Sequence, residues 1–219
     1  MLNLKDIKED RAVRAYINAA DASLAALGYT EHSFAHVTKV AETAASILET
    51  LGYDARTVEL ARIAGFLHDI GNLVNREEHS QSGAVMAFRI LDRLGMEPEE
   101  IATVVTAIGN HDEGTGVAVN PVAAALIIAD KTDVRRTRVR NSDPVSFDIH
   151  DRVNYSVFET NFTVDKDKCE VRLSVKIDTN IGSIMDYFQI FLNRMLMCQR
   201  AATSIGLAFK LTINEQSFM

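Results

Sequence analysis

The chain has 219 residues, of which 47% are apolar and 24% are charged, as is typical of a globular protein that can bury a core. A formal net charge of −7 argues against non-specific nucleic-acid binding, which needs a basic surface. Cys169 and Cys198 show no pairing pattern, and no apolar run approaches the about 18 residues of a membrane span. We therefore expect a cytoplasmic protein without disulfides, nucleic-acid partners or membrane contact.

Six helices are expected in the first two thirds of the chain, where apolar residues recur at helical spacing. Gly52 ends one of them, Asp54 is an N-cap, and Pro98 and Pro121 occupy first helical turns. The first half of the last helix is almost wholly apolar, so it must be buried. The expected helices cover residues 5–27, 31–51, 55–70, 79–94, 98–108 and 122–140.

The pattern changes after Asn141, and Asp143–Pro144 is expected to form a turn. Residues 158–164 and 169–177 then alternate apolar and polar side chains, which predicts two strands of a hairpin. A helix over residues 181–204 and a strand over residues 207–213 complete the prediction. The expected fold is therefore mainly α, with a helical region at 1–142 and a small β-β-α-β region at 143–219 that could dimerise, bind a regulator or cover a site.

His68 and Asp69 are adjacent at the carboxyl end of an Ala-rich helix, where the helix dipole favours a cation. Each such histidine alone has a simpler interpretation as a hydrogen-bonded core residue, and His32 and His150 are interpreted in that way. Asp130, in the apolar helix 122–140, is harder to explain in this way, because a carboxylate is costly to bury without a partner. Further imidazoles lie near helix ends at His36, His79 and His111. Imidazole and carboxylate ligands together suit iron, manganese, zinc or nickel.

In this order, the motifs resemble the HD superfamily of metal-dependent phosphohydrolases. The resemblance rests on His36-x-x-Lys39-Val40-Ala41, Leu67-His68-Asp69-Ile70-Gly71 and Ile128-Ala129-Asp130, and covers residues of about 31 to 140. It implies an all-α core that holds a divalent metal. His79-Ser-Gln-Ser-Gly83 and His111-Asp-Glu-x-x-Gly116 are placed like the extra histidines of the two-metal branch, which includes cyclic-di-nucleotide phosphodiesterases and symmetric dinucleoside-tetraphosphate hydrolases.

The same resemblance implies roles for these residues. Asp69 would bridge two metal ions, one completed by His36, His68 and Asp130 and the other by His79 and His111. A metal-activated hydroxide would be the nucleophile. Asp112 lies in a loop where it could act as a general acid. We expect one or two divalent transition metal ions, with iron or manganese favoured and zinc, nickel, cobalt or magnesium as alternatives.

Two departures from the family pattern concern the substrate. Asn72 stands where many two-metal members have a lysine, which removes one expected phosphate contact. The Gly-Tyr-Pro signature of the cyclic-di-nucleotide branch is absent, so that substrate is disfavoured. Lys131, Arg135 and Arg138 lie on one face of the expected helix 122–140, and these basic residues either bind phosphate or form a solvated helix end. Arg76 in the connecting loop 72–78 is a further candidate for phosphate binding.

The sequence thus predicts a metal-dependent phosphohydrolase that cleaves a phosphate ester or anhydride of a small phosphorylated metabolite, with a nucleotide preferred, and that could form a homodimer. The alternative is a non-catalytic metal- and nucleotide-binding sensor that signals through the C-terminal region. The number of candidate ligands favours the enzyme, because a pure binding module has no evident need of six. Binding of a nucleotide without turnover would favour the sensor.

Overall fold

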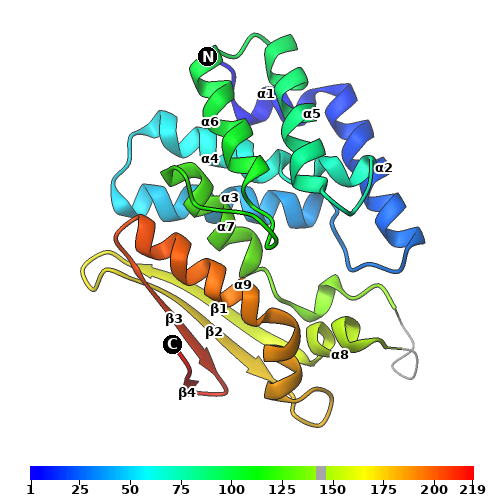
Figure 1. Ribbon diagram of the computed structural model, residues 1–219, viewed down its shortest axis with the longest axis vertical. Coiled ribbons are helices and arrows are strands. Elements are labelled where there is room, and N and C mark those ends of the chain that lie inside the picture. The colour runs from blue at the N-terminus through cyan, green and yellow to red at the C-terminus, as the bar shows by residue number, and fades with distance from the viewer. Residues whose placement is uncertain (142–146) are drawn as a thin grey trace.

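The computed structural model describes residues 1–141 and 147–219, and the described chain is mainly helical, as predicted (Figure 1). The predicted turn at Asp143–Pro144, and with it the boundary after residue 142, lies outside the described residues. The α-helices are α1 (Leu4–Glu9), α2 (Arg11–Ala26), α3 (Phe34–Leu51), α4 (Ala55–Leu67), α5 (His79–Arg93), α6 (Pro98–Gly109), α7 (Pro121–Lys131), α8 (Ile149–Ser156) and α9 (Ile184–Ser204). Two 3-10 helices, η1 (Ile70–Leu73) and η2 (Arg136–Arg138), and four strands, β1 (Val157–Asp165), β2 (Glu170–Ile177), β3 (Ala208–Ile213) and β4 (Gln216–Ser217), complete the fold.

Local capping explains where most helices begin and end. Gly52 closes α3 with a left-handed backbone (φ 86°), and the Asp54 side chain accepts hydrogen bonds from the first backbone N–H groups of α4. The expectation of one helix over residues 5–27 is wrong. Asp10 interrupts it, because its side chain accepts from the N–H groups of Ala12 and Val13 and begins α2.

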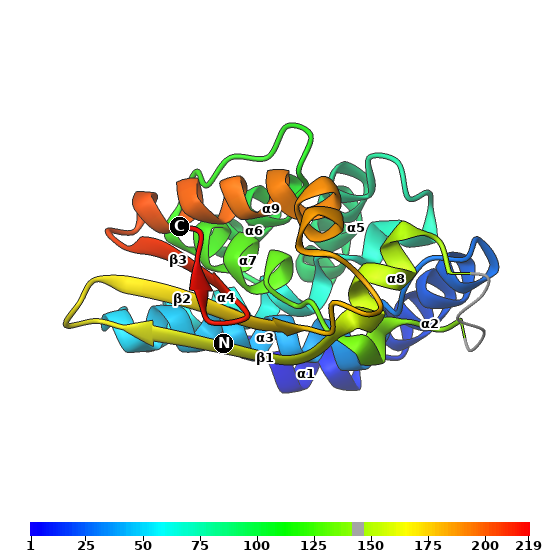
Figure 2. The ribbon, with the colours of Figure 1, turned by 90° about the horizontal axis from the view of Figure 1, so that it is seen from below.

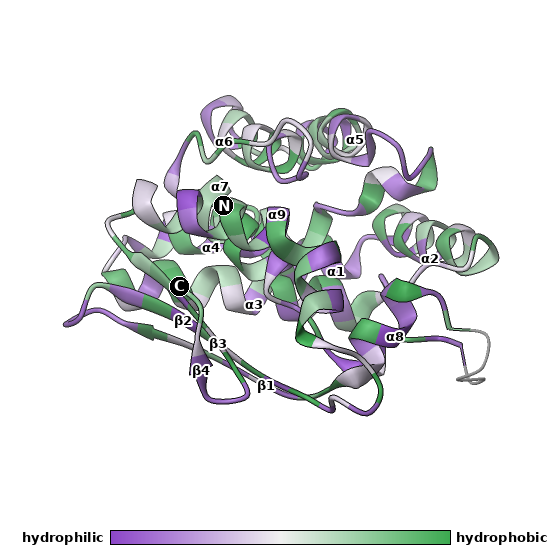
Figure 3. Cartoon of the chain, turned by 60° about the horizontal axis from the view of Figure 1, so that its bottom comes forward, coloured by the Kyte–Doolittle hydropathy of each residue, from purple (hydrophilic) through white to green (hydrophobic). Residues whose placement is uncertain are grey.

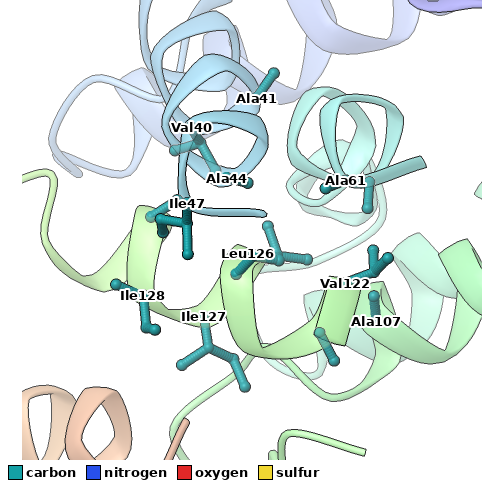
Figure 4. Close-up of a cluster of buried hydrophobic side chains, with 14 of the residues drawn as sticks. Val40, Ala41, Ala44, Ile47, Ala61, Ala107, Val122, Leu126, Ile127 and Ile128 are labelled. Atoms are coloured by element: carbon teal, nitrogen blue, oxygen red, sulfur yellow. The ribbon is translucent and has the colours of Figure 1, made fainter. Parts of the chain in front are cut away.

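Helix α7 lies at the centre of the core, and all but one of its residues from Val122 to Lys131 are buried. Figure 3 shows it as a mostly hydrophobic segment surrounded by other helices. The close-up in Figure 4 shows that α3, α4 and α6 surround it with small and branched apolar side chains, among them Val40, Ala44, Ala61 and Ala107.

The expected extension of this helix to residue 140 is wrong, because α7 ends at Lys131. The Thr132 hydroxyl donates to the carbonyl of Ile128 (2.7 Å) at this end. The buried Asp133 side chain then turns toward α3, where it accepts from His36. Arg135 and Arg138 therefore do not share a helical face with Lys131, since they follow the turn.

The predicted hairpin, helix and closing strand of the C-terminal region are present, together with α8 and the short β4. The sheet has the order β1-β2-β3-β4, with an antiparallel β1–β2 hairpin and a parallel β2–β3 pair joined by α9. Alternate β2 residues (Val171, Leu173, Val175 and Ile177) are buried, as the period of a half-buried strand requires.

Helix α9 connects the sheet to the helical body, because it packs against both α7 and β3. In Figure 1 it runs along the sheet, and Figure 2 shows the hairpin extending beside α3. Its buried residues belong to the same hydrophobic cluster as those of α7. Among residues 1–141 and 147–219, none of the helices combines the length and apolar character needed to cross a bilayer.

Candidate metal centre and substrate cavity

The six predicted metal ligands lie together, although five separate parts of the chain supply them. Four helix ends and one first helical turn deliver them: His36 in the first turn of α3, His68 and Asp69 at the end of α4, His79 at the start of α5, His111 just after α6 and Asp130 near the end of α7. All four imidazoles and the Asp69 side chain are buried. The carboxyl ends of α4, α6 and α7 meet here, and their dipoles favour a cation.

Each of these imidazoles has its Nδ1 atom next to an oxygen that can only accept a hydrogen bond. The carbonyls of Gly65, Arg76 and Ile108 lie 2.8, 3.1 and 2.6 Å from the Nδ1 atoms of His68, His79 and His111, respectively. The Nδ1 atom of His36 lies 2.8 Å from an Asp133 carboxylate oxygen. The Nδ1 atoms therefore carry the protons of the neutral rings, and the Nε2 atoms present lone pairs to the centre of the cluster.

The facing Nε2 atoms lack protein donors. Among the described residues, His36 Nε2, His68 Nε2 and Asp69 Oδ2 are buried without a hydrogen-bond partner. Two lone pairs also face each other, since His79 Nε2 and His111 Nε2 are 3.2 Å apart. Such an arrangement is unfavourable without a cation.

The separations within the cluster fit ligands that share an ion. His36 Nε2 and His68 Nε2 lie 3.4 and 3.6 Å from the same Asp130 oxygen, Oδ1. Ligands bound at about 2.1 Å to one ion are about 3.0–3.4 Å apart. The groups that approach closely enough to hold an ion are His36, His68 and Asp130, and His68, Asp69 and His111.

Asp69 faces both halves of the cluster with its two oxygens. Oδ2 lies 3.2 Å from His68 Nε2 and 3.4 Å from His36 Nε2, whereas Oδ1 lies 3.5 Å from His79 Nε2. The Asn72 amide fixes this orientation, because it donates at 2.9 Å both to Oδ1 and to the Asp69 carbonyl. Asn72, identified from the sequence only as a departure from the family pattern, therefore orients a candidate ligand.

Sequence reasoning missed Asp133, a buried carboxylate that holds His36 in place. Besides His36, its side chain contacts Lys39 Nζ at 2.8 Å and Arg135 Nε at 3.0 Å. Burial alone would raise the pKa of Asp133, but the hydrogen bond from His36 and the charges of Arg138 and Lys39 hold it well below its usual range. Asp133 and His36 are 97 residues apart, so no local pattern connects them.

The pKa values of Asp69, Asp130 and His68 are shifted strongly by one another and by Lys131. Burial alone would raise the pKa values of Asp69 and Asp130, but His68 beside the first and Lys131 beside the second hold them well below the usual range. Burial alone would lower the pKa of His68, yet the two carboxylates raise it to about 10. Two ionised carboxylates thus lie together at the cluster, balanced in the metal-free chain by protonated His68 and by Lys131; a bound cation would replace the proton on His68.

A cavity of about 400 Å³ opens onto this cluster and is lined by Asp69, His79 and Asp130. Residues 27–30 before α3, helix α8 and helix α9 form its other walls. His32 also lines it, with its ring 5.5 Å from that of His36, and so does His150 on α8. Four cationic side chains lie in the walls: Arg76, Lys131, Arg138 and Arg194.

Of the three residues predicted to bind phosphate, two line the cavity and one does not. Arg76 and Lys131 line the cavity. Arg135 does not, and its guanidinium donates to Asp133, Glu31 and Thr137. Arg138, which the sequence placed on one helical face with Lys131 and Arg135, also lines the cavity, although it follows an unexpected turn. Arg194 lines the cavity but was not assigned from the sequence, because it comes from α9.

The predicted general acid Asp112 lies beside a second hollow rather than in this cavity. That hollow is lined by Asp112, Arg76 and His79, among other residues. His79 and Arg76 line both spaces, so Asp112 lies near the cluster without lining the cavity itself.

Comparison with known proteins matches this site to a family. The HD domain family matches residues 33–135, a range that contains all six clustered ligands. Residues 33–135 of the chain are therefore an HD domain. With this match, the predicted class of metal-dependent phosphohydrolase is confirmed at that general level, and the clustered His and Asp groups could hold a metal ion.

Individual relatives differ in how much of their own length the chain covers. The uncharacterized protein MJ1020 of Methanocaldococcus jannaschii is 27% identical over 181 residues, which are 71% of this chain and 68% of that protein. Ribonuclease Y of Fervidobacterium nodosum is 32% identical over 118 residues, and ribonuclease Y 1 of Pediococcus pentosaceus is 30% identical over 137. These matches cover 52% and 61% of this chain but only 20% and 24% of the ribonucleases.

Among solved structures, a predicted HD superfamily hydrolase from an uncultured Thermotogales bacterium matches with a TM-score of 0.43 and 24% identity. The match covers 61% of this chain and 75% of that one.

Proposed function

We propose that this HD domain hydrolyses a phosphate ester or anhydride of a small phosphorylated metabolite, with nucleotides as the first class to test. The carrying observation is the cavity, which joins six clustered metal ligands to four cationic side chains. A phosphate group placed between them would meet charge of the required sign on both sides. The volume of about 400 Å³ lies within the range of small-molecule sites.

In this proposal, the clustered side chains hold one or two divalent ions, with iron or manganese favoured. His36, His68 and Asp130 form one set of ligands, His79 and His111 belong to the other, and Asp69 contacts both with its two oxygens. Bound divalent metals supply activation of water for attack on phosphorus and neutralise charge on the phosphoryl oxygens.

The protein residues around the ligands have separate roles. Asp133 and Asn72 orient His36 and Asp69, and Lys131, with Nζ 2.8 Å from Asp130 Oδ2, holds that carboxylate. Arg76 and Lys131 bind phosphate oxygens. Asp112 remains the proposed proton donor, and this role requires the leaving group to extend from the cavity toward the adjacent hollow that Asp112 and His79 line.

A polymeric substrate has less support. The two ribonuclease Y relatives share only a fraction of their length with this chain, and a net charge of −7 opposes binding of long polyanions. We therefore place single nucleotides and phosphorylated metabolites first and a short RNA second in a hydrolysis screen. The screen is run in parallel with manganese, iron, cobalt, nickel and magnesium.

The decisive test combines metal content with turnover. Protein loaded with manganese or iron is expected to retain metal after gel filtration, and His68→Ala is expected to lose both metal and hydrolysis. Arg89→Ala is the control, because Arg89 is exposed on α5 and lies outside both the cluster and the cavity. Failure of the loaded protein to retain any metal, or full hydrolysis by His68→Ala, would refute the proposal. Nucleotide binding without turnover under every metal would instead indicate a sensor.

A further inference from the structure

Helix α9, which lies outside the matched HD range of 33–135, brings an arginine into the cavity. Arg194 is half-buried, and its guanidinium carbon lies 4.8 Å from the centre of the Phe191 ring, which fixes the plane of the group. Its Nε atom lies 2.6 Å from Glu113 Oε1 in the loop after α6. Helix α9 packs along α7, so the arginine is held next to the helix that carries Asp130.

The terminal Nη atoms of Arg194 have no protein partner among the described residues, whereas those of the other two arginines in the cavity wall do. Arg138 donates to the carbonyls of Glu31 and Asp133, and Arg76 donates to Asn72. The Glu113 carboxylate contacts Arg194 at Nε, whereas within residues 1–141 and 147–219 its two terminal Nη atoms make no hydrogen bond or ion pair. A guanidinium has five N–H groups in a fork that matches a phosphate. Two terminal N–H₂ groups without an acceptor, on a side chain that lines the cavity, therefore point to a ligand that supplies one.

The local charge also favours an anion. Glu113 Oε1 is shared by two cations, Arg194 and Lys131, whose Nζ atom lies 3.5 Å away. Lys131 is also paired with Asp130 Oδ2 at 2.8 Å. Once Asp130 is engaged in holding a metal, the Glu113 carboxylate faces two positive side chains, so this end of the cavity is locally positive, while Asp148 and Asp151 line the part near α8.

We propose that Arg194 is a substrate-binding residue, whose guanidinium binds oxygens of the substrate phosphate beside the metal centre. The C-terminal region then completes a site that the HD domain alone leaves without this arginine. The inference rests on the proposed phosphohydrolase function, because it takes the phosphate to be the group that enters the cavity. Glu113 holds the guanidinium when no phosphate is present.

Inorganic phosphate is the probe, titrated calorimetrically into manganese-loaded full-length protein. Arg194→Gln is expected to weaken phosphate binding about tenfold or more, since a charge-assisted hydrogen bond is lost. Arg194→Lys is expected to restore part of the affinity, because it keeps the charge without the fork. Arg200→Gln, which removes an exposed arginine from the same helix, is the control and should bind phosphate as the wild type does.

Glu113→Gln separates binding from a structural ion pair. If Arg194 binds phosphate, removing its competing carboxylate leaves phosphate affinity equal or higher, whereas Arg194→Gln lowers it. If the pair only anchors α9, both variants lower the melting temperature and leave phosphate affinity unchanged, which overturns the inference. Loss of manganese from Arg194→Gln also overturns it, because the effect then belongs to the metal site. A wild type that retains manganese but binds no phosphate refutes the proposed function itself.

Discussion

Gly71, the glycine of the His-Asp motif, lies where the chain after α4 crosses the start of α5. A Cβ atom at this position would be 2.0 Å from the carbonyl oxygen of His79, 2.4 Å from the backbone nitrogen of Gly83 and 2.6 Å from the Ser82 hydroxyl. Two of these three atoms belong to the backbone, so side-chain rotation cannot relieve the overlap. Gly71→Ala must push the first turn of α5 away by about 1 Å or more, and His79 moves with it.

Overpacking of this kind costs about 1–3 kcal/mol and occasionally more. Because all the contacts are shorter than 3.0 Å, we expect the upper end, about 3 kcal/mol. For a chain of this size, that corresponds to a melting temperature lower by about 6–12 °C in the metal-free protein. The displaced imidazole should also reduce the manganese retained per chain. Scanning calorimetry and metal analysis measure the two effects separately.

Gly109→Ala is the matched control, because the added Cβ would meet only Ala84 Cβ at an ordinary 3.6 Å. A helical glycine replaced in this way should leave the free energy of unfolding unchanged or raise it by about 0.5–1 kcal/mol. A Gly71→Ala protein that melts within about 2 °C of the wild type and keeps its manganese would refute the reasoning. The close approach of η1 and α5 would then not hold His79 in place.

Asp133→Asn should weaken manganese binding by about 10–100-fold, measured by competition with a chelator, because the ring of His36 loses its charged acceptor; unchanged affinity would show that Asp133 does not orient the ligand. The pKa of Asp133 is held low in the folded chain, so its stabilising contribution is complete above the unfolded value of about 3.9 and is lost as the pH falls below it. In urea titrations of metal-free protein, the wild type should therefore lose more stability than Asp133→Asn on going from pH 5 to pH 3, and equal losses would contradict the assignment. A thiol reagent should modify Cys169, which is exposed, rapidly in the native state and Cys198 only on unfolding, because Cys198 is buried and burial raises its pKa.

Helix ends with a local cause could be predicted from the sequence. Gly52, Asp54, Pro98 and Pro121 act through their own backbone or first-turn contacts, and the structure has helix ends at all of them. The break at Asp10 had a signal of the same kind, but helical spacing on both sides concealed it.

The end of α7 could not be predicted in this way, because a distant contact decides it. Residues 132–140 contain no helix-breaking glycine or proline, yet Asp133 leaves the helical path to reach His36. The phosphate-binding face proposed for Lys131 and Arg135 depended on a continuous helix and is lost with it. The six candidate metal ligands could be identified from the sequence, because they follow the order of motifs of a known family. The residues that orient or complement them, Asp133 and Arg194, belong to no motif and meet the site only through packing.

The parallel pairing of β2 with β3 has a consequence for how the protein is made. During synthesis, β2 pairs with β1 as soon as the hairpin emerges, but its second edge stays open until residues 208–213 have left the ribosome. Helix α9 must also emerge before it can cover α7. For that interval the nascent chain exposes an unpaired apolar strand edge, which can join with strands of other chains. While residues 178–213 are being synthesised, this edge is open to aggregation, and slow translation there would lengthen that interval.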